Sequence, residues 1–189
     1  PSREGGRPDA FIASLNVTRI QKTQFFKSYF TIKFSGQVTD KRVLSSGKKL
    51  VGGMGSVRGY TLAEVSGDMG YNTSIDYTIP FPKPIKLFKG FPTLDQILSF
   101  NMFVDYAKVF TRDKLNADSP DDEISGYGVG VTLNVPKKQG KYPGFSFALS
   151  YAQPIPGMDE PARSTGGFGP SKPFPTPRGT VYLSGMVRY

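Results

Sequence analysis

Seven segments of the chain alternate apolar and polar side chains with a period of two, and this alternation constrains the fold most strongly. Successive side chains of a β-strand point to opposite faces, so the pattern predicts strands with one apolar and one polar face. Gly and Pro, at 22 and 16 of the 189 residues, suit the turns between strands. We therefore expect an all-β, antiparallel fold with almost no helix, with strands at about 11–20, 28–39, 66–81, 97–110, 124–135, 145–155 and 180–189.

The lengths and the two faces of these strands favour a transmembrane β-barrel. Strands of soluble proteins have about 5–6 residues, whereas a membrane-spanning strand needs roughly 9–11, as these segments provide. Their polar faces carry mainly Gly, Ser, Thr, Asn, Asp and Lys, which suit a water-filled lumen. Aromatic residues near strand ends resemble the aromatic girdles of such barrels: Phe81, Phe110, Phe145 and Tyr189.

The alternation also predicts which side chains face lipid. The expected lipid-facing set is apolar and lies opposite the polar positions of the same strands: Phe30, Ile32, Phe34, Leu98, Phe100, Met102, Val104, Val129, Val131, Phe147, Leu149 and Leu183. A soluble sandwich or lipocalin-like barrel is the alternative, and it would bury these side chains inside.

The connections between the strands alternate in length. Those at 21–27, 82–96 and 136–144 are short to moderate, and those at 40–66, 111–123 and 156–179 are longer. Outer-membrane barrels have short periplasmic turns and long extracellular loops. Seven strands leave two unpaired edges, which hydrocarbon does not tolerate. We therefore expect residues 1–189 to form the C-terminal part of a larger barrel, joined to an N-terminal remainder.

Composition argues against several functional classes. The chain has no Cys and no His, so thiolate zinc sites and imidazole bases are impossible within it. We expect neither an enzyme nor a cofactor or metal, and outer-membrane proteases and phospholipases are disfavoured. The net charge of +9 could indicate an anionic partner. The lysines of the chain, however, fall in Pro/Gly-rich turns and do not form one continuous basic face. We therefore expect no nucleic-acid partner.

One loop, at about 40–66, carries a distinctive motif. It contains Val57-Arg58-Gly59-Tyr60, and its glycines fit neither dinucleotide-binding nor P-loop spacing. The strand at 97–110 contains Phe103-Val104-Asp105-Tyr106-Ala107, whose Phe and Asp share the polar face. If this loop were folded into a barrel, Arg58 would need a partner there, and the lumen-facing carboxylate of Asp105 could supply a bidentate one. Gly55 and Gly59 would then permit the chain reversal.

These two motifs resemble those of the Omp85 superfamily. Val57-Arg58-Gly59-Tyr60 is similar to its VRG(F/Y) loop motif, and Phe103-Val104-Asp105-Tyr106-Ala107 to its FxDxG strand motif, with Ala107 in place of Gly. The extra methyl group puts the packing of the loop in doubt. The flanking residues Gly52-Gly53 and Ser66-Gly67-Asp68 look like the corresponding residues of one branch of the superfamily. This branch comprises the two-partner-secretion transporters (TpsB) of the haemolysin-activator type.

The resemblance implies a fold and a function. The fold would be a transmembrane barrel of sixteen strands, of which this chain supplies about the last seven. The function would be to pass an unfolded secreted protein across the outer membrane, with periplasmic POTRA domains that bind it. The VRGY loop would be folded into the lumen, where it stabilises or gates the pore.

The end of the chain provides a second resemblance. Val181, Leu183, Val187 and Tyr189 look like the outer-membrane assembly signal that the barrel-assembly machinery reads. Three alternatives remain open. A BamA- or TamA-like assembly factor shares both motifs, a passive porin-type channel needs no Arg58–Asp105 pair, and a soluble binding barrel would reverse the faces.

Overall fold

The computed structural model describes residues 3–113, 121–137, 143–155 and 179–188. Its main element is one antiparallel sheet of seven strands in the order β1-β2-β5-β6-β7-β8-β9. The strands are β1 (Ile12–Lys22), β2 (Tyr29–Thr39), β5 (Met69–Pro80), β6 (Leu98–Phe110), β7 (Asp122–Val135), β8 (Gly144–Pro154) and β9 (Thr180–Arg188). The seven predicted strands are confirmed, and their bounds agree within about three residues.

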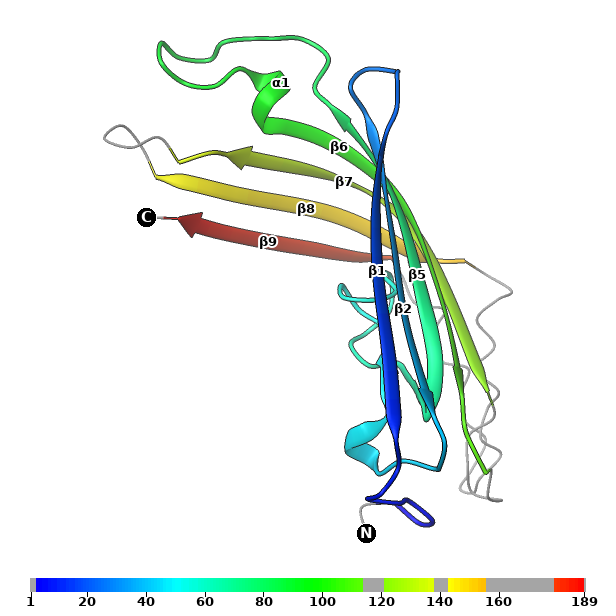
Figure 1. Cartoon of the computed structure of the whole chain (residues 1–189). Coiled ribbons are helices and arrows are strands. Elements are labelled where there is room, and N and C mark those ends of the chain that lie inside the picture. The colour runs from blue at the N-terminus through cyan, green and yellow to red at the C-terminus, as the bar shows by residue number, and fades with distance from the viewer. Residues whose placement is uncertain (1–2, 114–120, 138–142, 156–178, 189) are drawn as a thin grey trace.

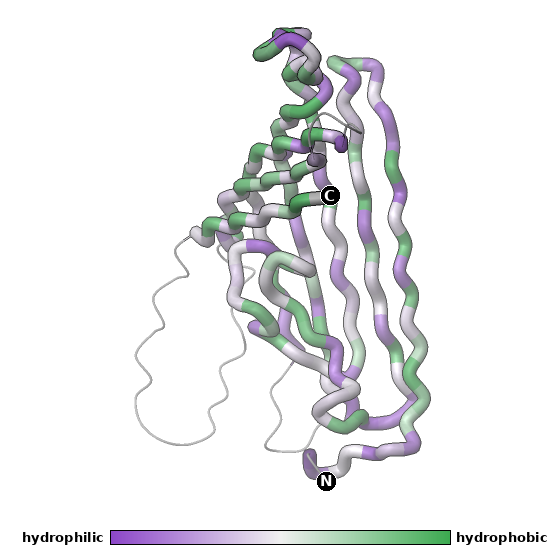
Figure 2. The backbone as a smooth tube through the Cα atoms, turned by 90° about the vertical axis from the view of Figure 1, so that its left-hand side faces the viewer, coloured by the Kyte–Doolittle hydropathy of each residue, from purple (hydrophilic) through white to green (hydrophobic). Residues whose placement is uncertain are grey.

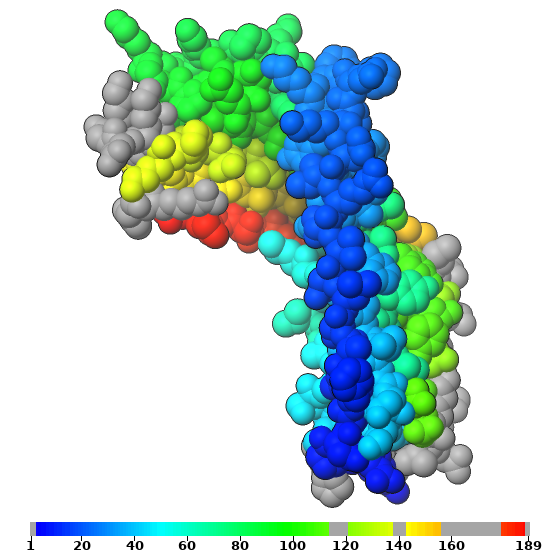
Figure 3. Space-filling model, viewed as in Figure 1, coloured from blue at the N-terminus to red at the C-terminus, as the bar shows by residue number. Residues whose placement is uncertain are grey.

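The sheet is strongly curved and open, with β1 and β9 at its two edges. Figure 1 shows β1, β2 and β5 standing upright while β8 and β9 run across them. The segment between β2 and β5 lies inside the curve, and the space-filling view shows it in cyan against the concave side (Figure 3). Closed barrels acquire this curvature from the tilt and twist of their strands.

The two faces of the sheet differ as the alternation predicts. We call the face that carries Asp105 the inner face; one row of paired residues across it comprises Thr18, Lys33, Ser74, Asp105 and Gly126. A row on the opposite, outer face comprises Phe30, Tyr77, Met102, Val129, Tyr151 and Val181. The hydropathy colouring of Figure 2 alternates along the strands accordingly. The outer face is apolar yet uncovered, with Met102 49% exposed.

We expect a charge on the outer face to destabilise the protein in a bilayer. Met102→Lys places an ammonium in the middle of the apolar row, which costs about 2–4 kcal/mol at the midplane of a transmembrane barrel. Thr18→Lys, on the inner face, is the matched control and should cost little. Urea unfolding in liposomes measures both changes, and equal costs would contradict the assignment of the faces.

The segment between β2 and β5 differs from the sequence-based prediction. The predicted strand 66–81 divides at Asp68: Val65–Gly67 forms β4, which pairs with β3 (Lys49–Val51) in a separate two-stranded sheet, and β5 begins only at Met69. The division occurs because the Asp68 carboxylate is fully buried among loop contacts. The periodicity of a strand continues through this point and does not reveal it.

Helix is confined to two short turns within the described residues. They are the 3-10 turn η1 (Ser45–Gly47) and the four-residue helix α1 (Leu94–Ile97), which lies in the connection between β5 and β6. In the part of the chain described, no helix has the length and apolar character needed to cross a membrane.

Candidate functional site

The segment from residue 40 to Asp68, which we call the motif loop, folds back over the inner face. Its β3–β4 hairpin brings the VRGY residues above β6 and β7, and Figure 1 shows this hairpin beside the inner surface of β5. Three glycines bend the loop with left-handed φ values, namely Gly52 at 118°, Gly53 at 84° and Gly59 at 103°. The expected role of Gly55 is wrong, because its φ is not left-handed and an added Cβ would meet no atom within 4 Å.

A small apolar core holds the motif loop on the sheet. Its members come from the loop and from β6 and β7: Val51, Val57, Tyr60, Val65, Ala107, Val109 and Ile124. Val57 and Ala107 are completely buried, so the methyl group of Ala107 is accommodated where the family motif has Gly. Burial of each large apolar side chain stabilises the loop by about 1.5–3 kcal/mol.

Arg58 makes a bidentate ion pair with Asp105. Its Nε lies 2.7 Å from Asp105 Oδ2 and its Nη2 lies 2.7 Å from Asp105 Oδ1. The backbone N–H of Arg58 also donates to Asp105 Oδ2 at 3.0 Å. The side chain of Asp105 is fully buried, so its charge depends on these three donors.

The guanidinium of Arg58 has a second carboxylate and an aromatic partner. Its Nη1 donates to Asp76 Oδ1 at 2.8 Å, and its Nη2 donates to Ser74 Oγ at 2.9 Å, both on β5. Its Cζ lies 3.4 Å from the centroid of the Phe103 ring. Arg58 thus bridges β5 and β6 and stacks on an aromatic face, a geometry that lysine cannot reproduce.

Glycines of β7 make room for the Arg58 backbone and the Phe103 ring. A Cβ added at Gly126 would lie 2.1 Å from the carbonyl oxygen of Arg58, and one at Gly128 would lie 2.4 Å from Cζ of Phe103. Both distances are below any normal contact. The inward-facing glycines of this strand therefore have a steric reason to be glycine.

The last strand holds the other side of the motif. The hydroxyl of Tyr182 on β9 accepts from the Gly59 N–H at 3.0 Å and donates to the Tyr60 carbonyl at 3.1 Å. Thr180 Oγ1 donates to the Gly59 carbonyl at 3.3 Å, and the Tyr60 hydroxyl donates to the Ser125 carbonyl at 3.0 Å. The motif is therefore fixed between β5 and β9, across five strands of the sheet.

The comparison with family models identifies a match over most of the chain. A model described as "Haemolysin secretion/activation protein ShlB/FhaC/HecB" matches residues 2–133, which include both motifs. The chain belongs to this family. Members of the ShlB/FhaC/HecB family are integral outer-membrane β-barrel transporters of two-partner secretion, the TpsB branch of the Omp85 superfamily. A search of curated proteins and a search of solved structures each gave no match.

Membership of the ShlB/FhaC/HecB family decides between the alternatives left open by the sequence. The chain is from a transporter and not an enzyme, and the family secretes haemolysin-type proteins. The assembly-factor, passive-porin and soluble-barrel interpretations are therefore set aside. No group of three or more acidic residues able to hold a metal occurs among the residues described.

Asp68 anchors the base of the motif loop, a role that the sequence did not reveal. Its carboxylate is fully buried and accepts from the guanidinium of Arg3, from the Val43 N–H at 3.2 Å and from the Arg112 N–H at 2.9 Å. Arg58 and Asp68 thus fix the loop at two separate places. A further contact joins the loop to β2: Lys49 Nζ donates to Ser35 Oγ at 3.1 Å, and burial lowers the pKa of Lys49.

The residues of the expected C-terminal assembly signal lie on β9. Val181, Leu183 and Val187 all point to the outer face and are more than half exposed. Tyr189 lies outside the described residues. Recognition of this strand by the assembly machinery stays a prediction.

We expect Tyr182→Phe to loosen the motif loop without unfolding the sheet. The change removes one hydroxyl and leaves the Gly59 N–H and the Tyr60 carbonyl without that partner, which costs about 1–3 kcal/mol. Because 1.4 kcal/mol is a factor of ten, amide exchange at 57–60 should accelerate by about tenfold or more.

Tyr151→Phe on the outer face is the matched control for Tyr182→Phe, since the Tyr151 hydroxyl accepts only from Gln153 there among the contacts described. It should leave exchange at 57–60 unchanged. Equal exchange in both variants would show that Tyr182 does not hold the loop.

Proposed function

We propose that residues 1–189 supply the C-terminal part of a closed barrel, about seven of its sixteen strands, and that the motif loop lies in its lumen. The inner face of the sheet would line the pore through which an unfolded haemolysin-type protein is secreted. POTRA domains in the remainder of the protein would receive that protein in the periplasm. The barrel-assembly machinery would insert the barrel by way of β9.

The ion pair between Arg58 and Asp105 carries this proposal. The pair lies on the inner face. This face is the concave side of the sheet, along which the motif loop lies (Figure 1), and in a closed barrel it would face the axis. A loop held there by two carboxylates, an apolar core and β9 occupies part of the lumen. The loop therefore has to shift, or leave a passage beside it, when a chain passes.

The orientation in the membrane follows from the connections. The connections at one end of the sheet, 23–28, 81–97 and 136–143, total 31 residues. Those at the other end, 40–68, 111–121 and 155–179, total 65 residues, although 111–121 is shorter than 81–97. By the habit of outer-membrane barrels, the first end faces the periplasm and the second the cell exterior. The motif loop would then enter the lumen from the outer side.

Channel recordings of the full-length transporter test whether the loop occupies the pore. Replacing residues 53–63 with a short Gly-Ser linker should raise the single-channel conductance, because it empties part of the lumen. Shortening the connection at 156–179 by the same number of residues is the control and should change conductance less. Unchanged conductance after removal of 53–63 would contradict a lumenal loop.

A further inference from the structure

Lysines and exposed aromatic residues gather at one end of the sheet. We call this end the basic rim, defined as residues 22–28, 81–96 and 135–137. It carries six exposed lysines and, among its charged residues, a single acid, Asp95: the lysines are Lys22, Lys27, Lys83, Lys86, Lys89 and Lys137. None of the six has an ion pair in the described part of the chain.

The opposite end of the sheet has a different charge pattern. There the described cations lie among carboxylates, as in the pairs Lys41–Asp9 and Arg3–Asp68. Acidic residues are frequent at that end, including Asp40, Asp113, Asp121 and Asp122. A general excess of surface lysine therefore does not explain the basic rim.

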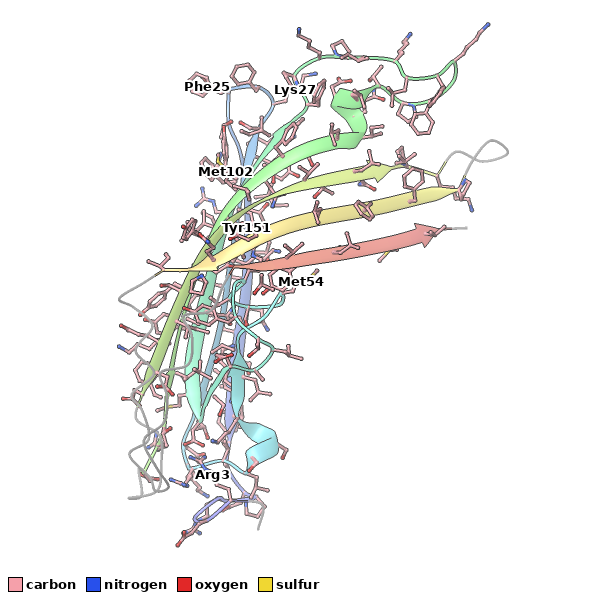
Figure 4. The ribbon with its side chains drawn as sticks, turned by 180° about the vertical axis from the view of Figure 1, so that it is seen from behind. Arg3, Phe25, Lys27, Met54, Met102 and Tyr151 are labelled. Atoms are coloured by element: carbon pink, nitrogen blue, oxygen red, sulfur yellow. The ribbon has the colours of Figure 1, made fainter. Side chains whose placement is uncertain are left out.

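Large apolar side chains project between the lysines of the basic rim. Phe25, Phe26 and Phe88 are each at least 70% exposed, and Ile85 and Leu87 about half exposed. They continue the apolar outer face directly, since Phe30 is the second residue of β2, just after the turn, and the Phe81 ring lies 6.4 Å from that of Phe100. Figure 4 shows Phe25 and Lys27 at the tip of the β1–β2 turn.

The β1–β2 turn holds its side chains in this exposed position. Phe26 and Lys27 both have left-handed φ values, 51° and 55°, which are unusual for bulky residues. The turn is closed by Ser28 N–H to the Phe25 carbonyl at 2.9 Å and by Ser28 Oγ to the Tyr77 hydroxyl at 2.8 Å. These hydrogen bonds hold the backbone that carries Phe25 and Phe26.

An arginine on the outer face points to the chemistry of the partner. Arg19 is exposed in β1, paired with Ile32, and its guanidinium donates to the Gln21 side chain at 3.0 Å. It lies on the outer face, two residue pairs farther from the β1–β2 turn than the Gln21–Phe30 pair. A long cation in this position can extend along the apolar surface to the level of lipid head groups.

We propose that the basic rim binds anionic glycerophospholipid at the membrane surface. Aromatic rings would insert at the interface while the lysines and Arg19 contact phosphodiester groups, the arrangement that suits an interfacial segment of this composition. The family's location in the outer membrane supplies the bilayer. The orientation proposed above decides only which leaflet is bound. A result that contradicts the proposed role in secretion would therefore leave the lipid-binding proposal unaffected.

Lipid retention by the purified full-length transporter tests the proposal. Native mass spectrometry in mixed micelles measures the retention of phosphatidylglycerol relative to phosphatidylcholine. Lys86→Gln with Lys89→Gln should lower this ratio, by about fivefold for each lysine that lies near the head groups. Lys41→Gln with Lys48→Gln, at the opposite end, removes the same charge and should leave the ratio nearly unchanged.

Three further measurements make the outcome decisive. Heat modifiability on gels confirms that both double variants keep a folded barrel. Phe25→Ser with Phe26→Ser should weaken retention of both lipids without changing their ratio. The proposal is overturned if the ratio is the same in wild type and in the Lys86/Lys89 variant, or if the control lowers it equally. Protection of the rim lysines from acetylation without lipid would also overturn it, because another part of the protein would then cover the rim.

Discussion

Replacing Arg58 with alanine should abolish secretion while the barrel still assembles. The change leaves Asp105, which is fully buried, and Asp76 facing each other without a cation. Breaking one partner of a buried pair costs about 3–5 kcal/mol in dry sites, and water in a lumen reduces this value. The motif loop is held by these contacts, whereas strand pairing does not involve them, so we expect the loop to detach from an intact sheet.

The two carboxylates should differ in importance. Asp105→Ala removes three bonds from Arg58, two from its side chain and one from its backbone N–H. Asp76→Ala removes one bond from Arg58 Nη1 and one from Ser74 Oγ. Loss of secretion should therefore be greater for Asp105→Ala than for Asp76→Ala. Arg58→Lys should also secrete poorly, because the lysine ammonium is a point charge that cannot bond both carboxylates and stack on Phe103. Exchanging the charges of Arg58 and Asp105 should rescue only in part.

Secretion of the cognate protein into the medium measures these effects, and heat modifiability of the outer-membrane fraction measures assembly. Lys33→Ala is the control, because it removes an exposed inner-face cation that lies in the same row as Asp105. Normal secretion by Arg58→Ala, at a normal level of folded barrel, would count against the proposed role of the pair.

Gly126→Ala should displace the motif loop by steric exclusion alone. Its new methyl carbon would lie 2.1 Å from the Arg58 carbonyl oxygen and 3.3 Å from the Gln153 carbonyl oxygen on β8, and its three nearest atoms are all backbone. Overpacking of this kind costs about 1–3 kcal/mol or more, which we expect the loop to avoid by leaving the sheet. Secretion should fall although every charged residue of the site is retained.

Gly185→Ala on β9 is the matched control for Gly126→Ala. An added methyl there finds its nearest atom at 3.9 Å, so a strand glycine is lost without a clash. Protease digestion of intact cells compares the loops of the two variants. If the motif loops of the two variants resist the protease equally and secretion is equal, the loop backbone at Arg58 does not lie against Gly126 in the membrane.

The strands and their faces could be predicted because they depend on local alternation. A residue's face follows from its parity within a strand, which is why Asp105 and Phe103 were correctly placed together. The pairing of Arg58 with Asp105 also needed the motif resemblance, and the contacts confirm it. Ala107 fits because β6 faces an apolar part of the loop at this point.

The remaining partners of Arg58 could not be predicted from local pattern. Ser74 and Asp76 lie on the inner face with Asp105, but their nearness to Arg58 depends on the register between β5 and β6. Tyr182 lies 123 positions from Gly59, and only the path of the loop brings them together. Gly55 is close to the motif in sequence but has no left-handed φ, whereas Gly52, Gly53 and Gly59 make the bend.

An experimental structure of the complete transporter in a lipid bilayer tests the central claim most directly, through the position of Arg58. The account predicts a closed barrel with the motif loop in its lumen and Arg58 Nε and Nη2 each about 2.7 Å from the Asp105 carboxylate oxygens. A motif loop outside the barrel, or a guanidinium beyond hydrogen-bond distance of about 3.5 Å from Asp105, would contradict it.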